Sequence, residues 1–473
     1  MATTTVSIGS NQSIVTLTPN VCNSLSPSSD GWEVGFTAGS ISADVSVGDI
    51  QVYADASSSS NYYFLVTAIN GARTRCNLKY LTDDSATGSA SPCAMYNDWF
   101  EQQAGVFKRA FSTITLFEAM VDDASPTYWG SSDDVVGQCH GDSNFTDSRV
   151  YFDNKQSLAS VKLTAILSDR HDGTASGSSS GKVLIRPTVG TPTNQGIIEV
   201  NIDNFILEWV EIDFDALDST TSHKAVVLGG TNDDNIIRNN LIHDKYGNPG
   251  AVGPNMIFVG GAGAASDTLS VLNNIIYNVI ETDGDHAVAI NVAQWAGNVY
   301  VYNNTMWNIT SNDSGTDKYA YGVQFGNAAA QTAFIKNNIV SKLTSDDDNE
   351  RAYFKVLSGA TSTVANNLSD DTTNATYDAK DMGQSLNDSS ALIGKTEAQI
   401  DFVSVTGGSE DLHIDTSSVC REAGVDLGTT NEVNIDIDGF DRDSNGVVWD
   451  IGADQTANDA SSTANPAFLL MVI

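Results

Sequence analysis

Pairs of asparagines recur at a nearly constant interval along the second half of this chain, and each pair lies inside a short apolar segment. The first asparagines of the five pairs are Asn239, Asn273, Asn303, Asn337 and Asn366. Successive pairs are 34, 30, 34 and 29 residues apart. Units of this length cannot bury their own apolar faces, so the repeat predicts that successive copies stack on one another around one continuous core.

The residues that flank each pair indicate how one repeat lies on the next. Two positions before the first asparagine, every copy has an aliphatic residue, which we expect to face the core: Ile237, Val271, Val301, Ile335 and Val364. Two positions after it, the residues are again nearly all apolar: Leu241, Ile275, Thr305, Ile339 and Leu368. An upstream copy aligns at an offset of 31 residues, with Ile206 matching Ile237 and with Glu208 and Trp209 in place of the pair.

The asparagines themselves indicate a bend between two strands. Asparagine tolerates left-handed backbone geometry, and its side chain can hydrogen-bond to its own copy in the next repeat. We therefore predict a structural ladder formed by the first asparagine of each pair. Another short apolar segment precedes each pair, as in AVVLGG at residues 225–230, and the connecting segments are polar and irregular. Because this pattern disfavours crossover helices, the sequence predicts an all-β fold of stacked parallel strands rather than a doubly wound sheet.

This arrangement resembles the right-handed parallel β-helix proteins of the pectate-lyase-like superfamily, whose coils carry an inward asparagine ladder at a tight bend. The end of the chain is similar to the closing segment of many such proteins, with the family positions occupied by Asp438, Gly439, Arg442, Asp450, Ile451, Gly452 and Ala453. Residues 111–123 (FSTITLFEAMVDD) are similar to the stretch that opens β-helices in predicted virion proteins of marine bacteriophages. The resemblance implies a right-handed parallel β-helix over about residues 111–455.

The sequence divides into three parts. Residues 1–105 have the alternation of a small β-rich attachment module, residues 106–370 contain a capping helix and the coils, and residues 371–473 contain the final coils and the closing motif. The capping helix is predicted around Ile114, Phe117 and Met120, with Ser112 at its start, and it would cover the edge of the first coil. The final segment AFLLMVI is strongly apolar, and we expect it to dock as a strand on its own rod or on a second subunit of a homo-oligomer.

Charge limits the partners of this chain. It has 23 Lys and Arg against 59 Asp and Glu, a formal net charge of −36, so broad electrostatic binding of nucleic acid or of an anionic membrane is disfavoured. The sequence has no secretory signal pattern and no membrane-length apolar segment. Assembly into a virion that is released by lysis would give such a chain a route outside the cell. Secretion after loss of a leader is the alternative. Cys76 and Cys93 can pair across a loop, although buried free thiols are the safer expectation.

Acidic residues supply the candidate catalytic groups. Asp244 follows His243, and Asp283, Asp285 and His286 lie on the next coil. Two carboxylates of this kind can hydrolyse a glycosidic bond, one as the acid and one as the base or nucleophile. The competing interpretation is structural, because Asp244 also belongs to a column of mostly polar residues five positions after each first asparagine.

Aromatic residues and one acidic loop supply the candidate ligand sites. Trp295, Trp307 and Tyr319 can stack on sugar rings if they face solvent, although packing under neighbouring loops is the more common fate of such residues. Asp441, Asp443 and Asn445 precede Gly446 in the spacing of a calcium loop, but the usual glutamate at the twelfth position is replaced by Gly452. We expect no obligatory cofactor, and calcium is the one ion that the sequence suggests.

Taken together, these features predict a structural protein of a bacteriophage virion surface, such as a spike, fibre or capsid decoration. Its N-terminal module would contact other virion proteins, and its rod would be able to contact polysaccharide. Two alternatives remain open at this point. One is a polysaccharide hydrolase or lyase of the same fold acting as a depolymerase, although no arginine-rich group of a lyase is evident. The other is a secreted adhesin or filament subunit.

Overall fold

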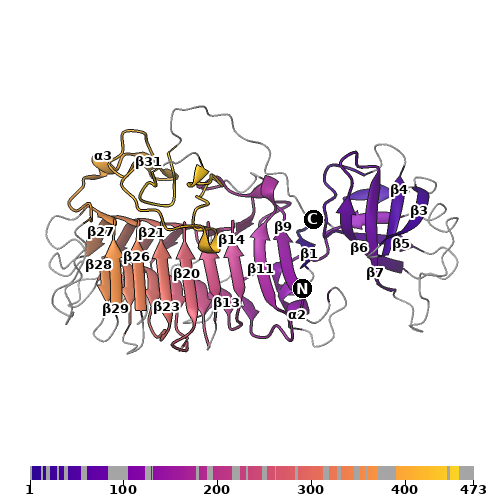
Figure 1. Ribbon diagram of the computed structural model, residues 1–473, viewed down its shortest axis with the longest axis horizontal. Coiled ribbons are helices and arrows are strands. Elements are labelled where there is room, and N and C mark those ends of the chain that lie inside the picture. Colours follow the sequence, from indigo (N-terminus) through magenta and orange to yellow (C-terminus); the bar gives the residue numbers. More distant parts are fainter. Residues whose placement is uncertain are drawn as a thin grey trace.

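The computed structural model describes residues 3–11, 14–17, 22–28, 31–36, 41–54, 61–83, 105–122, 129, 132–176, 181–188, 195–215, 224–230, 233–247, 253–261, 263–282, 286–312, 319–326, 332–345, 352–356, 361–370, 390–444 and 448–456. Three parallel sheets form an elongated body, a small antiparallel module lies at one end, and the C-terminal segment runs along one side (Figure 1). Within the described ranges, no helix is both long enough and apolar enough to cross a membrane.

The three sheets, which together we call the three-sheet stack, are built from strands that alternate along the chain. The first sheet has the order β1 (Thr3–Ile8), β9 (Asp134–Cys139), β11 (Ser160–Ala165), β14 (Phe205–Glu208), β17 (Asn235–Arg238), β20 (Thr268–Leu272), β23 (Asn298–Tyr302), β26 (Thr332–Lys336) and β29 (Thr361–Ala365). The second has β10 (Val150–Phe152), β13 (Gly196–Val200), β16 (Lys224–Leu228), β19 (Asn255–Val259), β22 (Ala287–Val292), β25 (Ala320–Phe325) and β28 (Ala352–Val356). The third has β12 (Leu184–Ile185), β15 (Glu211–Asp213), β18 (Leu241–Tyr246), β21 (Ile275–Glu281), β24 (Thr305–Ser311), β27 (Ile339–Ser345) and β30 (Leu368–Ser369).

Equivalent residues of successive repeats lie beside one another in this stack, as the repeat predicts. Ile237 pairs with Val271, Val271 with Val301, and Val301 with Ile335, each in parallel register. All four side chains are fully buried in the main apolar core. The all-β prediction is confirmed, and each repeat contributes one strand to each of the three sheets.

The upstream repeat is offset by 30 residues, and the predicted offset of 31 is wrong. Leu207, not Ile206, pairs with Ile237, and Glu208 pairs with Arg238. Because side chains alternate along a strand, the one-residue shift puts Leu207 in the core and leaves Ile206 only partly buried. Trp209 then takes the bend position of Asn239, and both residues have a left-handed φ, +60° and +52°.

The second asparagine of each pair forms the ladder that we predicted for the first. In the middle of the ladder, Asn304 Oδ1 accepts hydrogen bonds from the backbone and side-chain amides of Asn274, both at 3.0 Å. Asn304 Nδ2 donates in turn to Asn338 Oδ1 at 3.0 Å. The same pattern joins Asn240 to Asn274 and Asn338 to Asn367. The first asparagines have a positive φ of 52° to 56°, and that bend turns their own side chains away from the core.

A short helix covers the start of the stack. Helix α2 spans Ile114–Val121, and the Thr113 side chain caps it by accepting a hydrogen bond from the Leu116 amide at 3.1 Å. The helix is therefore confirmed, with Thr113 in place of the expected Ser112 as its cap. Phe117 is buried against Gly137 of β9, where an added Cβ would lie 2.7 Å from the ring.

The antiparallel module is inserted into the first turn of the stack. Its sheet has the order β2 (Val15–Leu17), β8 (Gly105–Lys108), β5 (Ile50–Ala54), β6 (Asn61–Ile69), β7 (Arg75–Asp83), β4 (Gly31–Phe36) and β3 (Cys22–Ser28). Strand β1 precedes it and pairs with β9, so the first strand of the chain belongs to the stack although it lies inside residues 1–105. The chain leaves and re-enters the stack at adjacent points, because the Arg109 amide donates to the Asn11 carbonyl at 3.1 Å.

Residues 390–444 and 448–456, which we call the C-terminal cover, lie along the third sheet (Figure 1). Residues 371–389 lie outside the described residues, so the final coils expected from residue 371 onward stay a prediction. They contain α3 (Glu397–Ile400), the antiparallel hairpin β31 (Phe402–Thr406) and β32 (Ser409–Ile414), and a short 3-10 turn at Thr430–Glu432. Ile400, Leu412 and Ile451 of the cover pack on an outer apolar stripe of the stack that includes Leu241 and Ile339. The apolar column after each pair is therefore buried by the cover rather than by the inner core.

Cys139 and Cys420 are buried free thiols, and Cys76 is also buried. Cys93 and the terminal AFLLMVI lie outside the described residues, so their predicted contacts are not tested.

Candidate functional site

The candidate catalytic residue Asp244 belongs to a second polar ladder. Asp244, Asn278, Asn308 and Lys342 take the same position in successive turns, and all have a left-handed φ between 52° and 61°. Asn278 Nδ2 donates to Asp244 Oδ1 at 2.8 Å, and Asn308 Nδ2 donates to Asn278 Oδ1 at 2.6 Å. These bonds favour the structural interpretation of Asp244 over the catalytic one.

His243 lies beside this ladder between two carboxylates. Its Nδ1 is 2.9 Å from Asp244 Oδ2, and its Nε2 is 3.0 Å from Glu211 Oε1. The ring stacks on that of Tyr277 in the next turn, with centroids 5.0 Å apart and an angle of 6° between the planes. Burial opposes the charged imidazole, but the hydrogen bonds to Asp244 and Glu211 prevail and raise the pKa of His243 to about 10.

Two more carboxylates complete the group that we call the His243 cluster: Glu211, Asp213, His243, Asp244, Tyr277 and Glu410. Asp213 pairs with Arg186 at 3.0 Å, and burial raises the pKa of its carboxyl group. Glu410 comes from the C-terminal cover, and its Oε1 accepts a hydrogen bond from Asn278 Nδ2 at 2.9 Å. Sequence reasoning missed Glu410 because it lies 132 residues from Asn278 along the chain.

The contacts of His243 do not suit a general base. A general base must have a free nitrogen or oxygen near its working pH, whereas both nitrogens of His243 contact carboxylates and its raised pKa keeps the ring protonated. His286 immediately precedes the second-sheet strand β22 and is half-buried against Tyr319 and Tyr321, so it is not part of this cluster. Asp283 and Asp285 lie outside the described residues, and their catalytic role stays a prediction.

We expect substitution of His243 by glutamine to flatten the pH dependence of stability in alkaline solution. The folded-state pKa of about 10 lies above the ordinary value of about 6.5, so the charged ring stabilises the folded state fully below about pH 6.5. That contribution disappears as the pH rises towards 10, at up to about 1.4 kcal/mol per pH unit. Urea unfolding between pH 6 and 10 in the presence of EDTA measures the difference, and parallel curves for the two proteins would contradict the assignment.

The three aromatic residues proposed to bind sugar do not face solvent, so that prediction is wrong for them. Trp295 is fully buried, and an added Cβ at Gly263 would lie 2.9 Å from its ring. Trp307 is 2 % exposed and donates from Nε1 to Glu397 Oε2 of the C-terminal cover at 2.9 Å. Tyr319 is 8 % exposed and stacks on Tyr321. Neighbouring loops and the cover bury these rings, because an apolar ring on a sheet is stabilised by being covered.

The described part of the predicted calcium loop uses its oxygens within the protein. Asp441 Oδ1 accepts hydrogen bonds from Asn434 Nδ2 at 2.7 Å and from the Asp443 amide at 3.0 Å. Asp443 Oδ1 accepts one from Trp449 Nε1 at 3.1 Å. Asn445 lies outside the described residues, and calcium binding at this loop stays a prediction.

The first asparagine of each pair holds the C-terminal cover. Their side-chain amides donate to backbone carbonyls of the cover: Ile435 and Asp436 for Asn239, Val433 and Ile435 for Asn273, Val433 for Asn303, Val425 for Asn337, and Ala423 for Asn366. The closing motif adds to this contact. The Gly452 amide donates a hydrogen bond to the Asn337 carbonyl at 2.8 Å. The backbone of Gly452 has a φ of +107°, and an added Cβ would lie 2.5 Å from Ile339 Cδ1, so only glycine fits.

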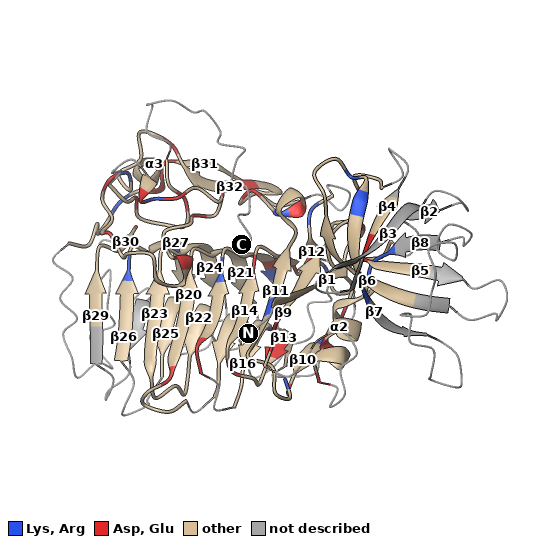
Figure 2. Cartoon of the chain, turned by 45° about the vertical axis from the view of Figure 1, so that its right-hand side comes forward, with Lys and Arg blue, Asp and Glu red and all other residues tan. Residues whose placement is uncertain are grey.

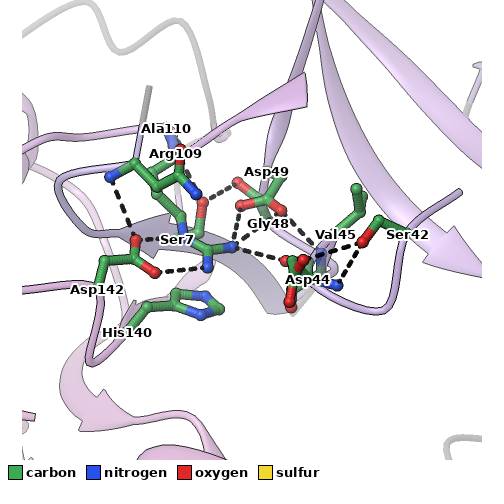
Figure 3. A network of polar contacts seen from close by, with 12 residues as sticks. Ser7, Ser42, Asp44, Val45, Gly48, Asp49, Arg109, Ala110, His140 and Asp142 are labelled. Atoms are coloured by element: carbon green, nitrogen blue, oxygen red, sulfur yellow. Dashed lines mark hydrogen bonds and ion pairs between the residues drawn. The ribbon is translucent and has the colours of Figure 1, made fainter. Parts of the chain in front are cut away.

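Arg109 joins the antiparallel module to the stack (Figure 3). Its Nη1 is 3.1 Å from Asp49 of the module, and its Nε is 2.9 Å from Asp142 of the stack. The Arg109 and Asp49 side chains are 4 % and 0 % exposed. Burial raises the pKa of Asp49, whereas Asp142 has a lowered pKa because its hydrogen bonds from Arg109 outweigh its own burial. A buried cation therefore connects the two parts of the molecule, beside the hydrogen bonds from Ser7 to the Gly48 carbonyl.

A scan of the chain against protein-family models gives no match, and searches of curated proteins and of solved structures also give none.

Proposed function

We propose that this chain is a right-handed parallel β-helix and that it serves as a structural protein on the surface of a bacteriophage virion. The observation that carries the proposal is the use of aligned polar residues along the rod. Both asparagines of the pairs, and the column that contains Asp244, bond to neighbouring turns or to the C-terminal cover. Polar side chains that bond to neighbouring turns stabilise the rod itself, and such a surface is suited to a rigid support.

The order of the strands supports the β-helix. Strands β17, β18 and β19 belong to the first, third and second sheets, and β20 returns to the first sheet beside β17. All pairings in the three sheets are parallel, and each repeat is about one turn long. Such a rod needs no helix between strands, in agreement with the irregular connections of the sequence.

The antiparallel module is the part that we assign to attachment. It is inserted between Asn11 and Arg109 and projects from one end of the stack, where Figure 2 shows it beside α2. Other virion proteins are its proposed partners, and the rod would then be displayed outward as a monomer or as a homo-oligomer. The same arrangement would serve a secreted adhesin, with a cell-surface component in place of the virion protein.

Excision of the module tests this assignment. Because Asn11 and Arg109 are joined by a backbone hydrogen bond, residues 12–108 can be replaced by a two-residue Asn-Gly turn that keeps β1 beside β9. We expect the excised protein to fold, with the parallel-sheet circular dichroism of the full chain, but to remain unbound when particles assemble. The tagged full chain should sediment with the particles. Equal incorporation of both proteins would contradict the attachment role.

The depolymerase alternative needs a separate test. A panel of bacterial and algal polysaccharides is incubated with the full chain, and reducing ends and unsaturated uronic products are measured. We expect no cleavage. Cleavage that is lost in both Asp283→Ala and Asp285→Ala would replace the structural proposal by the enzymatic one.

A further inference from the structure

One polar atom in the His243 cluster lacks a partner. The Tyr277 side chain is 1 % exposed, and its hydroxyl makes no hydrogen bond with any residue in the described part of the chain. The Tyr277 ring stacks on His243 with centroids 5.0 Å apart, and burial, together with the charges of Asp244, Glu410, Glu211 and Asp213, raises the pKa of its phenol. A buried hydroxyl without a partner is costly, and its position among carboxylates indicates a ligand that supplies the missing bond.

Three side chains beside Tyr277 present ligand atoms at the spacing of a metal site. One atom each of Asp213, His243 and Asp244 lies within 4.8 Å of the other two. The Asp213 and His243 side chains are 6 % and 2 % exposed, and Asp244, at 22 %, is the member that solvent reaches. Nitrogen and carboxylate ligands in a partly buried group of three are typical of Zn²⁺ and similar ions, which complete their coordination with water.

The charges of the cluster also favour a cation. Glu211, Asp213, Asp244 and Glu410 provide four carboxylates, and the Arg186 guanidinium pairs with Asp213. On the outer side, Asp215 pairs with Arg186, and the Tyr246 hydroxyl donates a hydrogen bond to Asp244. A divalent ion that binds one nitrogen of His243 displaces the proton from that nitrogen, and the proton is released to the solvent.

We propose that Asp213, His243 and Asp244 bind one divalent transition-metal ion of the Zn²⁺ class, with the Tyr277 hydroxyl bonded to the coordination sphere. The ion joins β15 and β18 in adjacent turns of the stack and lies under Glu410 of the C-terminal cover. It would therefore reinforce the rod at the point where the cover crosses it. The group His413, Asp438 and Asp454 has similar spacing, but among the described residues no orphan hydroxyl accompanies it.

The test uses the metal-free full chain at pH 8 with ZnCl₂, and with CoCl₂ as a spectroscopic probe. Zn²⁺ should raise the melting temperature, and Co²⁺ should give visible absorption bands of nitrogen and oxygen coordination. His243→Gln should abolish both signals. Tyr277→Phe should fold at least as stably as the wild type without metal, and it should bind Zn²⁺ about tenfold more weakly, as expected for loss of a partner of the coordination sphere. His413→Gln is the matched control and should retain the signals.

Undiminished Zn²⁺ binding in Tyr277→Phe and His243→Gln would overturn the proposal, as would the absence of any Zn²⁺ effect on the wild type. Loss of the signals in His413→Gln but not in Tyr277→Phe would also overturn it, by moving the site to the other group. If His243→Gln does not fold, Tyr277→Phe alone decides, because it removes one hydroxyl and no charge. Stabilisation by Ca²⁺ that equals that by Zn²⁺ would contradict a site built on an imidazole nitrogen.

Discussion

Replacement of Asn304 by alanine should lower the free energy of unfolding by about 2–5 kcal/mol, because it breaks the inner ladder at its centre. Asn304 Oδ1 accepts from two amide groups of Asn274, and its Nδ2 donates to Val271 O at 2.9 Å. The backbone amide of Asn274 would be left buried without an acceptor. Each such loss costs about 1–3 kcal/mol. Urea unfolding followed by tryptophan fluorescence measures the change.

Asn298→Ala is the control for this substitution. Asn298 lies on β23 in the same turn, and its side chain is only partly buried on the outer face. We expect a change within about 0.5 kcal/mol. Equal effects of the two substitutions would mean that the inner asparagines do not form a cohesive ladder.

Replacement of Arg109 by methionine should cost about 3–5 kcal/mol and should uncouple the antiparallel module from the stack. Methionine has a similar length but leaves the fully buried Asp49 without its cation, and it removes two contacts with Asp142 of 2.9 and 3.0 Å. We expect urea unfolding of the variant to separate into two transitions, with the module unfolding first. Limited proteolysis should then cut residues of the module before those of the stack.

Arg75→Met supplies the comparison, because Arg75 and Glu33 form an exposed ion pair of 2.7 Å within the module. An exposed pair of this kind contributes about 0–1 kcal/mol. A single transition for Arg109→Met with a loss as small as that of Arg75→Met would contradict the role of Arg109 as the connection between the two parts.

The repeat in the sequence predicted the stack because its signal is local. Each aliphatic residue before an asparagine pair is buried, and the step between pairs equals the step between paired strands, as for Val271 and Val301. The helix from Ile114 to Val121 was also predictable, since its apolar spacing and its preceding hydroxyl residues are adjacent in the chain. These features need no knowledge of distant contacts.

The wrong offset of the upstream repeat has a physical cause. An apolar alternation alone cannot distinguish an offset of 30 from one of 31 when the bend residues are atypical. Trp209 takes the left-handed position of Asn239, although a bulky residue is rarely found there. Val210 takes the place of the inner asparagine, and its amide donates to Asn240 Oδ1 at 3.3 Å. An apolar residue is accepted at that position because the ladder ends there.

The sequence pointed to Asp244 beside His243, but the contacts that the C-terminal cover adds to the site could not be predicted. The cover contributes Glu410 to the His243 cluster and Glu397 to Trp307, and both come from segments far along the chain. The sequence indicated that Asp438, Arg442 and Gly452 belong to a closing motif, but it did not indicate which face of the rod they close. The aromatic residues that looked like ligand sites are the ones that this cover and the loops bury.

A crystal structure of the full chain at a resolution that places side chains is the most direct test of the central claim that equivalent residues of successive repeats stack in register. The account predicts one column of hydrogen-bonded amides through Asn240, Asn274, Asn304, Asn338 and Asn367 beside a buried aliphatic column through Ile237, Val271, Val301 and Ile335. Electron density in which these residues are dispersed, or in which helices separate the repeats, would contradict it.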